Sequence, residues 1–388
     1  MSTVDSTLHR PAPWAVVGSG LAVVAVAFGL SRYGYGLLLP EMRSSLGLGL
    51  GALGVIGAGS YAGYLVASLA APRLVSLWGL RWTVVLGGLA ATGGMLLCAA
   101  ATGAVSLGAG ITLAGASAAL VWPPYIAAVE THLAVGRRPR AHGLINSGTA
   151  YGVAVAGPLS LVAGSSWRTA WIVFAVLAVA ATAWCALVLG PHRPPADAGE
   201  RGARLRSVAR RQGTGLLATA ALLGLVSSCY WTFGVEVATA AAPVGGSSGA
   251  VFQLVVGLSG VAGGAVGALL TRATLPRLLA LMALALSAAC LLLTTGPAWL
   301  VLLSAALYGA AFIASIGLLV IWNTHVVPEA AATGVATSMF AMGVGLIIGP
   351  PLAGTAADTW GIDAVFLACS PLCAAVAVLV RDPRSTSA

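Results

Sequence analysis

Long apolar segments alternate with short polar connections along nearly the whole chain. An α-helix needs about 20 mostly apolar residues to cross the hydrocarbon core of a bilayer, and most of the segments reach that length. The pattern predicts an all-α polytopic membrane protein with twelve transmembrane helices. The expected helices are residues 14–39, 51–72, 82–102, 106–133, 142–164, 168–189, 214–240, 249–270, 277–296, 298–326, 333–356 and 363–381.

One long connection divides these helices into two groups of six. It is rich in Pro, Gly and Arg, and Leu205 to Arg211 within it could form a short interfacial helix. The predicted parts are a cytoplasmic tail (1–13), an N-terminal six-helix bundle (14–189), a cytoplasmic central loop (190–213), a C-terminal six-helix bundle (214–381) and a second cytoplasmic tail (382–388).

The two groups repeat each other. Glu130-Thr131-His132 near the end of the fourth helix matches Asn323-Thr324-His325 near the end of the tenth. Gly157-Pro158 in the fifth helix likewise matches Gly349-Pro350 in the eleventh. A parallel repeat of six helices is the architecture of one large class of transporters.

The arginines predict the orientation of the chain in the membrane. All 19 basic residues are arginine, and most lie in the tails and in alternate connections. The intervening connections hold only Arg43 and Arg168, and Arg32 lies within the first predicted helix. Because cytoplasmic loops are enriched in basic residues, both termini are expected in the cytoplasm, with the protein in a bacterial inner membrane.

Composition excludes several other classes of protein. The chain is 59% apolar and 7% charged, whereas a soluble domain carries about a quarter charged residues. The net charge of +9 is explained by topology and contact with anionic lipids, since no basic stripe suited to nucleic acid occurs. Without lysine there is no phosphate-binding loop for a nucleotide. The six cysteines lie in apolar segments and are expected to be buried, so neither a metal site nor a cofactor is expected.

Polar and aromatic side chains gather in the first, fourth, seventh and tenth predicted helices, which therefore are expected to line a central cavity. Ionisable groups inside a bilayer are costly and usually functional. The candidates for the cavity are Arg32, Tyr35, Trp122, Tyr125, Tyr230, Trp231, Tyr308, Trp322 and Asn323.

Arg32 is the first of these candidates. It could orient an anionic or polar substrate, balance Glu236, or extend outward to the membrane surface. Tyr35 lies three residues further on and can share a helix face with Arg32, so we favour Tyr35 over Tyr33 as a cavity residue. The aromatic residues would suit a hydrophobic or cationic compound, or could be ordinary packing material.

Glu236, Glu130 and His325 are the candidates for proton coupling. Glu236 lies in the outer half of the seventh helix and could load a proton, pair with Arg32, or lie among the outer headgroups. Glu130, His132 and His325 lie near cytoplasmic helix ends, where capping of the helix or pairing with Arg137 to Arg140 is the alternative.

Two stretches carry a family resemblance. SRYGYGLLLPEMRSSLGL (31–48) and GSYAGYLVASLAAPRL (59–74) are similar to the YbfB/YjiJ-like subfamily of major facilitator superfamily transporters. The resemblance implies two six-helix bundles, alternating access and a cavity lined by helices one, four, seven and ten. In GTAYGVAVAGP (148–158) the resemblance is to a motif associated with antiporters, and the residues expected to serve helix packing are Gly148, Gly152, Gly157, Pro158, Gly349 and Pro350.

The chain also departs from the family pattern. In PRLVSLWGLR (72–81) Gly79 and Arg81 are kept, but Ser76 stands where an Asp is expected. Ile111 stands where the fourth helix often has an Arg assigned to proton coupling. Both departures weaken a direct transfer of the family's coupling mechanism.

The expected function is secondary active transport of a small organic solute, coupled to protons and directed to efflux by antiport, in a protein that works as a monomer. Uptake by symport is the alternative. From other classes, a polytopic membrane enzyme would need a dense carboxylate and His cluster on one membrane face, which the isolated Asp358 and Asp363 do not form. A sensor that binds a ligand without moving it is the third possibility.

Overall fold

A computed structural model describes residues 13–162, 166–190, 201–241, 247–264, 275–294 and 296–379, and within these ranges all regular structure is helical. The helices of the N-terminal half are α1 (Pro13–Val24), η1 (Ala25–Leu30), α2 (Gly34–Leu46), α3 (Leu50–Ala99), α4 (Ala104–His132), η2 (Val135–Arg137), α5 (Arg138–Val162) and α6 (Trp167–Val188). Those of the C-terminal half are α7 (Arg201–Ala241), α8 (Ser248–Gly264), α9 (Leu275–Thr294), α10 (Ala298–Val326), η4 (Pro328–Ala330), α11 (Ala331–Trp360) and α12 (Ile362–Leu379).

The first membrane span is interrupted in its middle. Element η1 is a π-helix, in which Ser31 N–H donates to Val26 O (2.8 Å) and Tyr33 N–H donates to Phe28 O (3.1 Å). A turn over residues 31–33 follows, and α2 then continues to Leu46 before Gly47 ends it with φ 63°. The span is therefore longer than the predicted 14–39, because the polar residues after Pro40 stay helical.

Helix α3 contains two segments. Gly79 has φ 83° and ψ 174°, which breaks the helical backbone and divides α3 close to the predicted gap between residues 72 and 82. Only glycine adopts such a φ without strain. Eight spans among the described residues are long and apolar enough to cross a membrane, α3 being counted once, and α8 and part of α12 are shorter apolar helices.

Helix α7 begins earlier than the sequence suggested. It runs without a break from Arg201 to Ala241, so that residues 201–213 of the predicted central loop are helical. The prolines of that loop all precede residue 196, and Arg, Ala, Leu and Gln favour a helix once they are past. The rest of the loop (191–200), the start of the N-terminal tail (1–12) and the end of the chain (380–388) lie outside the described residues.

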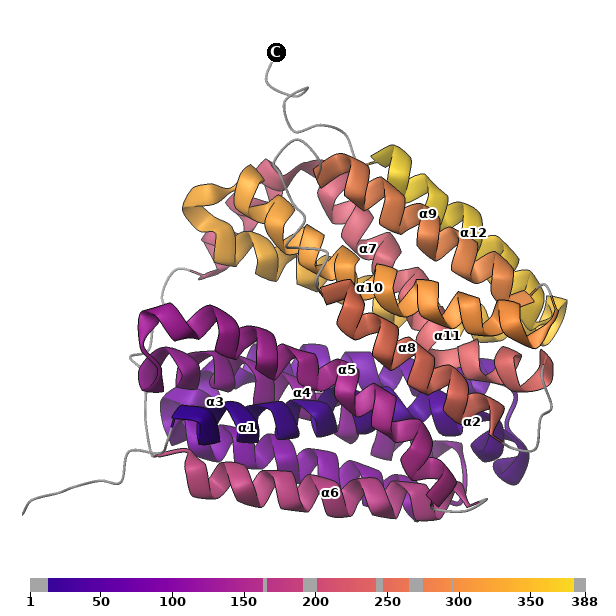
Figure 1. The fold of residues 1–388 in the computed structure, drawn as a ribbon, viewed down its shortest axis with the longest axis horizontal. Helices are drawn as coiled ribbons and strands as arrows, with labels where there is room; N and C mark the ends of the chain where they lie inside the picture. The colour runs from indigo at the N-terminus through magenta and orange to yellow at the C-terminus, as the bar shows by residue number, and fades with distance from the viewer. Residues whose placement is uncertain are drawn as a thin grey trace, which may run out of the picture.

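The two halves lie one above the other in Figure 1, with the N-terminal half below. Helix α6 forms the lower margin, and α9 and α12 form the upper margin. Large apolar side chains point outward from these helices, among them Leu187 at 85% exposure and Leu281 at 55%, as expected for faces in contact with lipid.

Glycines bring helices into backbone contact inside each half. Gly29 of η1 and Gly152 of α5 lie against each other, and Gly148 lies against Leu21 of α1. Gly349 of α11 lies against Leu225 and Ser228 of α7 in the same way. Such close crossings are typical of membrane helices, whose interfaces are rich in small residues. All six cysteines are buried, as expected.

Candidate functional site

The connections with few arginines meet at one end of the molecule, which we name the outer end. Arg168 at the start of α6 donates to the carbonyl of Ala101 (2.8 Å) and to Oγ of Ser45 (3.5 Å), which ties three of these regions together. The opposite end, which includes Gly79 and the α4–α5 connection, is named the inner end. In Figure 1 the outer end is on the right.

The halves touch at the outer end through backbone contacts. A Cβ on Gly36 of α2 would collide with the carbonyl of Trp231 in α7, and one on Gly54 of α3 would collide with the carbonyl of Pro350 in α11. The packing of α5 on α8 is equally close. Its contacts are Gly157 with Ala250, and Gly257 with Ala154.

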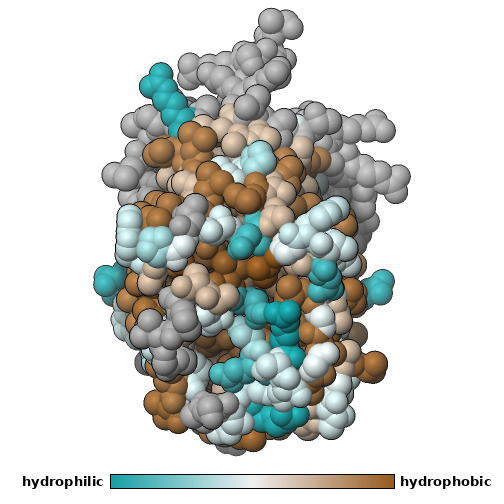
Figure 2. All heavy atoms as spheres, turned by 90° about the vertical axis from the view of Figure 1, so that its right-hand side faces the viewer, coloured by the Kyte–Doolittle hydropathy of each residue, from teal (hydrophilic) through white to brown (hydrophobic). Residues whose placement is uncertain are grey.

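Charged side chains add two connections at the same end. Arg43 of α2 forms an ion pair with Glu236 of α7. Asp358 of α11 accepts hydrogen bonds from the N–H groups of Leu50 (3.0 Å) and Gly51 (2.8 Å), the first residues of α3. A carboxylate at a helix N-terminus satisfies otherwise free N–H donors and interacts favourably with the helix dipole. Figure 2 views the molecule from this end and shows hydrophilic residues across the middle of the face.

Polar groups near the inner end are satisfied within one half. Glu130 pairs with Arg138 and with His142 (3.0 Å), all in the N-terminal half. Asn323 donates to Oγ of Ser338 (3.1 Å) in the C-terminal half. Among the described residues, the ion pair and the carboxylate hydrogen bonds between the halves lie at the outer end.

Arg32 lies in the turn between η1 and α2, midway through the first span, and is only 8% exposed. Its guanidinium carbon is 4.7 Å from the ring centre of Tyr61 and 4.6 Å from that of Tyr64, both on α3. Phe28 and Tyr33 each lie at 5.9 Å. No carboxylate in the described part of the chain forms an ion pair with Arg32, and its Nε is buried without a hydrogen-bond partner.

A cluster of stacked rings continues from Arg32 into the C-terminal half. Tyr33 stacks on Trp231 with ring centres 4.1 Å apart, which joins the two halves. Trp231 meets Tyr308 edge to face at 5.6 Å, and Tyr308 stacks on Tyr230 at 3.6 Å. Phe312 of α10 completes the cluster beside Tyr308 and Trp231.

The hydrogen-bonding groups of these rings differ. Tyr230 bonds to Oγ of Ser304 (2.7 Å), and Tyr308 donates to the carbonyl of Ser227 (3.1 Å). Nε1 of Trp231, in contrast, is buried without a partner. Two N–H donors, those of Arg32 and Trp231, are therefore left free beside the ring of Tyr33.

A family model described as "Major Facilitator Superfamily" matches residues 21–341. The chain belongs to the major facilitator superfamily. It is thus a multi-pass membrane transporter that takes a small-molecule substrate, not an enzyme. No curated protein sequence matches the chain at a significant level.

Solved structures of superfamily transporters share the fold. A mutant of the nucleoside transporter NupG has 14% identity and a TM-score of 0.79, with 94% of this chain and 98% of that chain covered. A bacterial homologue of the human lysosomal transporter Spinster, in an inward-facing and occupied conformation, has 14% identity and a TM-score of 0.70, with 95% of each chain covered. At these identities the likeness concerns the fold alone.

Several of the predicted cavity residues lie elsewhere in this major facilitator fold. Tyr35 donates its hydroxyl to the carbonyl of Leu53 (2.7 Å) within the N-terminal half. Tyr125 is fully buried inside that half, bonded to Ser19 (2.9 Å) and to Cys185 (3.0 Å). Neither hydroxyl is free to meet a solute, so both residues are left out of the proposed site.

The remaining predicted residues fall into four groups. Asn323 and Trp322 are buried near the inner end of α10, and Trp122 is half-buried on α4. Glu130 and His325 are exposed.

Gly79 forms the break in α3, and the guanidinium carbon of Arg81 lies 5.4 Å from the ring centre of Trp82. Pro158 and Pro350 lie inside α5 and α11 next to the glycines that make close contacts.

The sequence reasoning missed the aromatic surroundings of Arg32. Tyr61 and Tyr64, three residues apart in the second predicted helix, were a usable signal, because this spacing places both rings on one face. Phe28 is not among the predicted cavity residues, and the preference for Tyr35 leaves out Tyr33.

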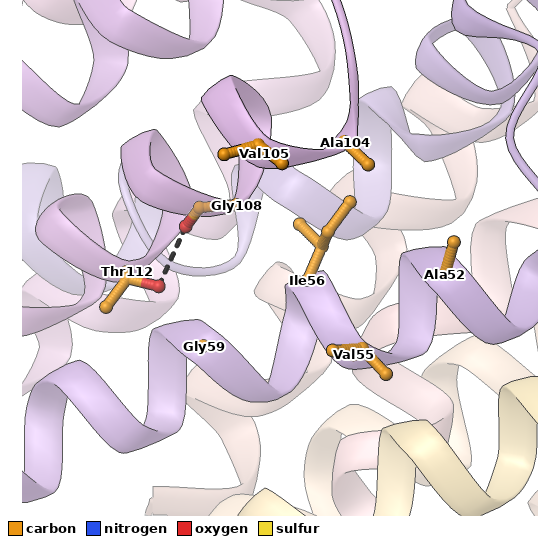
Figure 3. Close-up of a pocket in the computed structure, with 8 residues that line it drawn as sticks. All are labelled: Ala52, Val55, Ile56, Gly59, Ala104, Val105, Gly108 and Thr112. Atoms are coloured by element: carbon orange, nitrogen blue, oxygen red, sulfur yellow. Dashed lines mark hydrogen bonds between the residues drawn. The ribbon is translucent and has the colours of Figure 1, made fainter.

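A shallow apolar pocket of about 430 Å³ lies outside the contact between the halves. Figure 3 shows its lining by residues of α3 and α4, including Val55 and Val105, with one hydrogen bond from Thr112 to the carbonyl of Gly108. Val105 is 88% exposed, so this pocket opens on the outer surface of the N-terminal half. It is separate from the site around Arg32.

Proposed function

We propose that this protein is a secondary active transporter that moves a small organic solute by alternating access across a bacterial inner membrane. Twelve crossings, cytoplasmic termini and a monomeric functional unit are part of the proposal. The observation that carries it is the position of the contacts between the halves. The ion pair, the Asp358 contact and the shortest backbone contacts between the halves lie at the outer end, and Arg32 with its ring cluster lies beneath them.

On this proposal the described conformation faces inward. The solute reaches Arg32 and the ring cluster from the inner end, past Phe28 and Tyr64, which are only half-buried. To release the solute outside, the backbone contacts, the Arg43–Glu236 ion pair and the Asp358 contact must separate. The inner ends of α4, α5, α10 and α11 must then close.

Glu236 is the coupling carboxylate in this scheme. It is paired with Arg43 while the outer end is closed, and its second oxygen is buried without a partner. When the halves separate, Glu236 loses the Arg43 guanidinium that compensates its charge, and a proton can take the place of that partner. Glu236 would thus bind a proton facing outward and release it facing inward, which drives a solute outward by antiport.

Other features support this assignment less directly. Glu130 is exposed and already paired within its own half, and His325 is exposed at the inner end, so both are poorer candidates for coupling than Glu236. The glycines of α5 pack on η1 and on α8. This fits the antiporter-like motif and the resemblance to the YbfB/YjiJ-like subfamily.

The test is transport in proteoliposomes. Counterflow and gradient-driven flux of a panel of organic solutes would be measured with and without an imposed pH gradient. We expect an inward proton gradient to drive at least one solute in the opposite direction, outward. Glu236→Gln should remove the dependence on pH, while the control Glu130→Gln should keep it.

Three other outcomes would each refute one part of the proposal. Flux in the same direction as the protons would establish uptake by symport and refute efflux. Binding of solutes without flux of any of them would identify a sensor and refute the transport proposal. An unchanged pH dependence in Glu236→Gln would remove Glu236 from the coupling mechanism.

A further inference from the structure

The charge of Arg32 has no counterpart in the described protein. Arg43 and Glu236 neutralise each other at the outer end, and Glu130 is paired at the inner end. Arg32 has only ring faces around it, at 4.6 to 5.9 Å. A lone charge inside a membrane protein is expensive, and an ionic ligand or partner is the usual compensation.

The ring faces around Arg32 are already occupied by a cation. Aromatic rings attract cations through their quadrupoles, and this stabilises the guanidinium where it lies. A second cation brought to the same rings would be repelled by Arg32. The aromatic cluster therefore disfavours the cationic solute that its ring content alone suggests.

The free hydrogen-bonding groups at the site have the same preference. Nε of Arg32 and Nε1 of Trp231 are donors, and both side chains are at least nine-tenths buried. The ring of Tyr33 contacts both residues, with its centre 5.9 Å from the guanidinium carbon and 4.1 Å from the Trp231 ring centre. Buried donors without partners are costly, so a ligand that supplies acceptors is favoured.

We propose that Arg32 and Trp231 bind the anionic group of the solute, and that the transported compound is an organic carboxylate with a flat aromatic group. This inference rests on the proposed transport function. The carboxylate accepts from Nε of Arg32 and Nε1 of Trp231. The aromatic group lies against Phe28 and Tyr64, the half-buried pair whose ring centres are 6.3 Å apart on the inner side of Arg32.

Three probes with one ring system test the charge preference. Indole-3-acetate, indole-3-acetamide and tryptamine present an anion, a neutral amide and a cation on the same indole. Their affinities for the purified full chain would be measured by isothermal titration calorimetry. We expect the anion to bind at least tenfold more tightly than either of the others.

Variants then locate the source of the preference. Arg32→Gln should lower the ratio of anion to amide affinity to about one, whereas Arg32→Lys should keep a preference of reduced size. Arg140→Gln removes one charge from an exposed position and should leave the ratio unchanged. Trp231→Phe keeps a ring but loses the N–H, and should weaken binding of the anion about threefold to tenfold and binding of the amide by less, because a hydrogen bond to a charged acceptor is the stronger one.

Four results would overturn the inference. The first two concern the unchanged protein: the amide or the amine binds as tightly as the anion or more tightly, or the anion does not bind at millimolar concentration. The other two concern the variants: the preference for the anion survives in Arg32→Gln, or Arg140→Gln loses it to the same extent as Arg32→Gln. Failure of the transport proposal is recognised separately. Driven flux without charge preference would refute only the organic anion, and Arg32-dependent anion binding without flux would refute only transport.

Discussion

Removal of Arg43 should open the outer end. In the closed state its guanidinium pairs with Glu236, and the two side chains are 40% and 14% exposed. An exposed ion pair contributes up to about 1 kcal/mol to the stability of the state that contains it, and loss of one partner from a buried pair destabilises that state by about 3–5 kcal/mol. One partner here is half-exposed and the other is mostly buried. We therefore expect Arg43→Gln to destabilise the closed outer end by about 2 kcal/mol, a factor of roughly thirty in the equilibrium between states.

The change can be followed as a distance between the halves. Ser45 at the end of α2 and Thr359 at the end of α11 are exposed at the outer end, and the native cysteines are all buried. Spin labels on Ser45→Cys and Thr359→Cys would report the outer separation by double electron–electron resonance. Arg43→Gln should add a long-distance population to the distribution.

Two further variants give the prediction its controls. Glu41→Gln removes a neighbouring exposed carboxylate on α2 and should leave the distribution unchanged. Arg43→Gln combined with Glu236→Gln should open the outer end less than Arg43→Gln alone, because no carboxylate is then left without its partner. The same distribution in Arg43→Gln and Glu41→Gln would show that the ion pair does not hold the outer end closed.

Three other predictions concern a helix cap, a backbone contact between the halves and a buried tyrosine. Asp358→Asn should weaken the capping of α3 by about 1 kcal/mol and raise the equilibrium constant for opening of the outer end about fivefold, seen as a larger long-distance population; an unchanged distance distribution would contradict a role in closure. Gly257→Leu cannot fit against Ala154, so it should hold α5 and α8 apart and abolish flux in a folded protein, whereas Gly264→Leu on the same helix has room and should transport normally. Tyr125→Phe should lower the free energy of unfolding by about 1 kcal/mol, followed by thermal denaturation, with flux unchanged; lost flux at normal stability would place Tyr125 on the solute path.

The helical layout was predictable because its cause is local. Each segment must be long and apolar enough to span a bilayer, and for α10 the predicted and observed bounds are the same residues, 298–326. Boundaries failed where polar residues continue a helix, as in α7 from Arg201 and α2 beyond Pro40. Hydropathy marks where the apolar stretch ends and cannot show that the backbone stays helical beyond it.

The partners of charged residues were not predictable in the same way. Arg43 and Glu236 are 193 positions apart in the sequence, and only the approach of α2 to α7 brings them together. Arg43 was interpreted as a connection residue and Asp358 as an isolated acid. Both lie at the ends of apolar helices, where sequence alone does not distinguish a surface charge from a contact between halves.

The preference for Tyr35 over Tyr33 as a cavity residue stays a prediction, but the contacts of the structure favour Tyr33. Residues three apart share a face only if the helix between them is regular. Element η1 ends at Leu30 and the turn at 31–33 follows it, and Tyr35 donates its hydroxyl to the carbonyl of Leu53. Tyr33 is the residue that reaches both Arg32 and Trp231.

Backbone contact between glycines and carbonyl groups at the outer end also determines whether water and protons can pass between the halves. A water molecule needs a space of about 10–15 Å³, and protons cross membranes along chains of hydrogen-bonded water. At Gly36 and Gly54 not even a methyl group fits between the halves, which leaves no room for such a chain at these crossings. In the proposed transporter these glycines would therefore limit proton leakage, and we expect Gly54→Ala to raise the proton permeability of proteoliposomes before it alters the passage of solute.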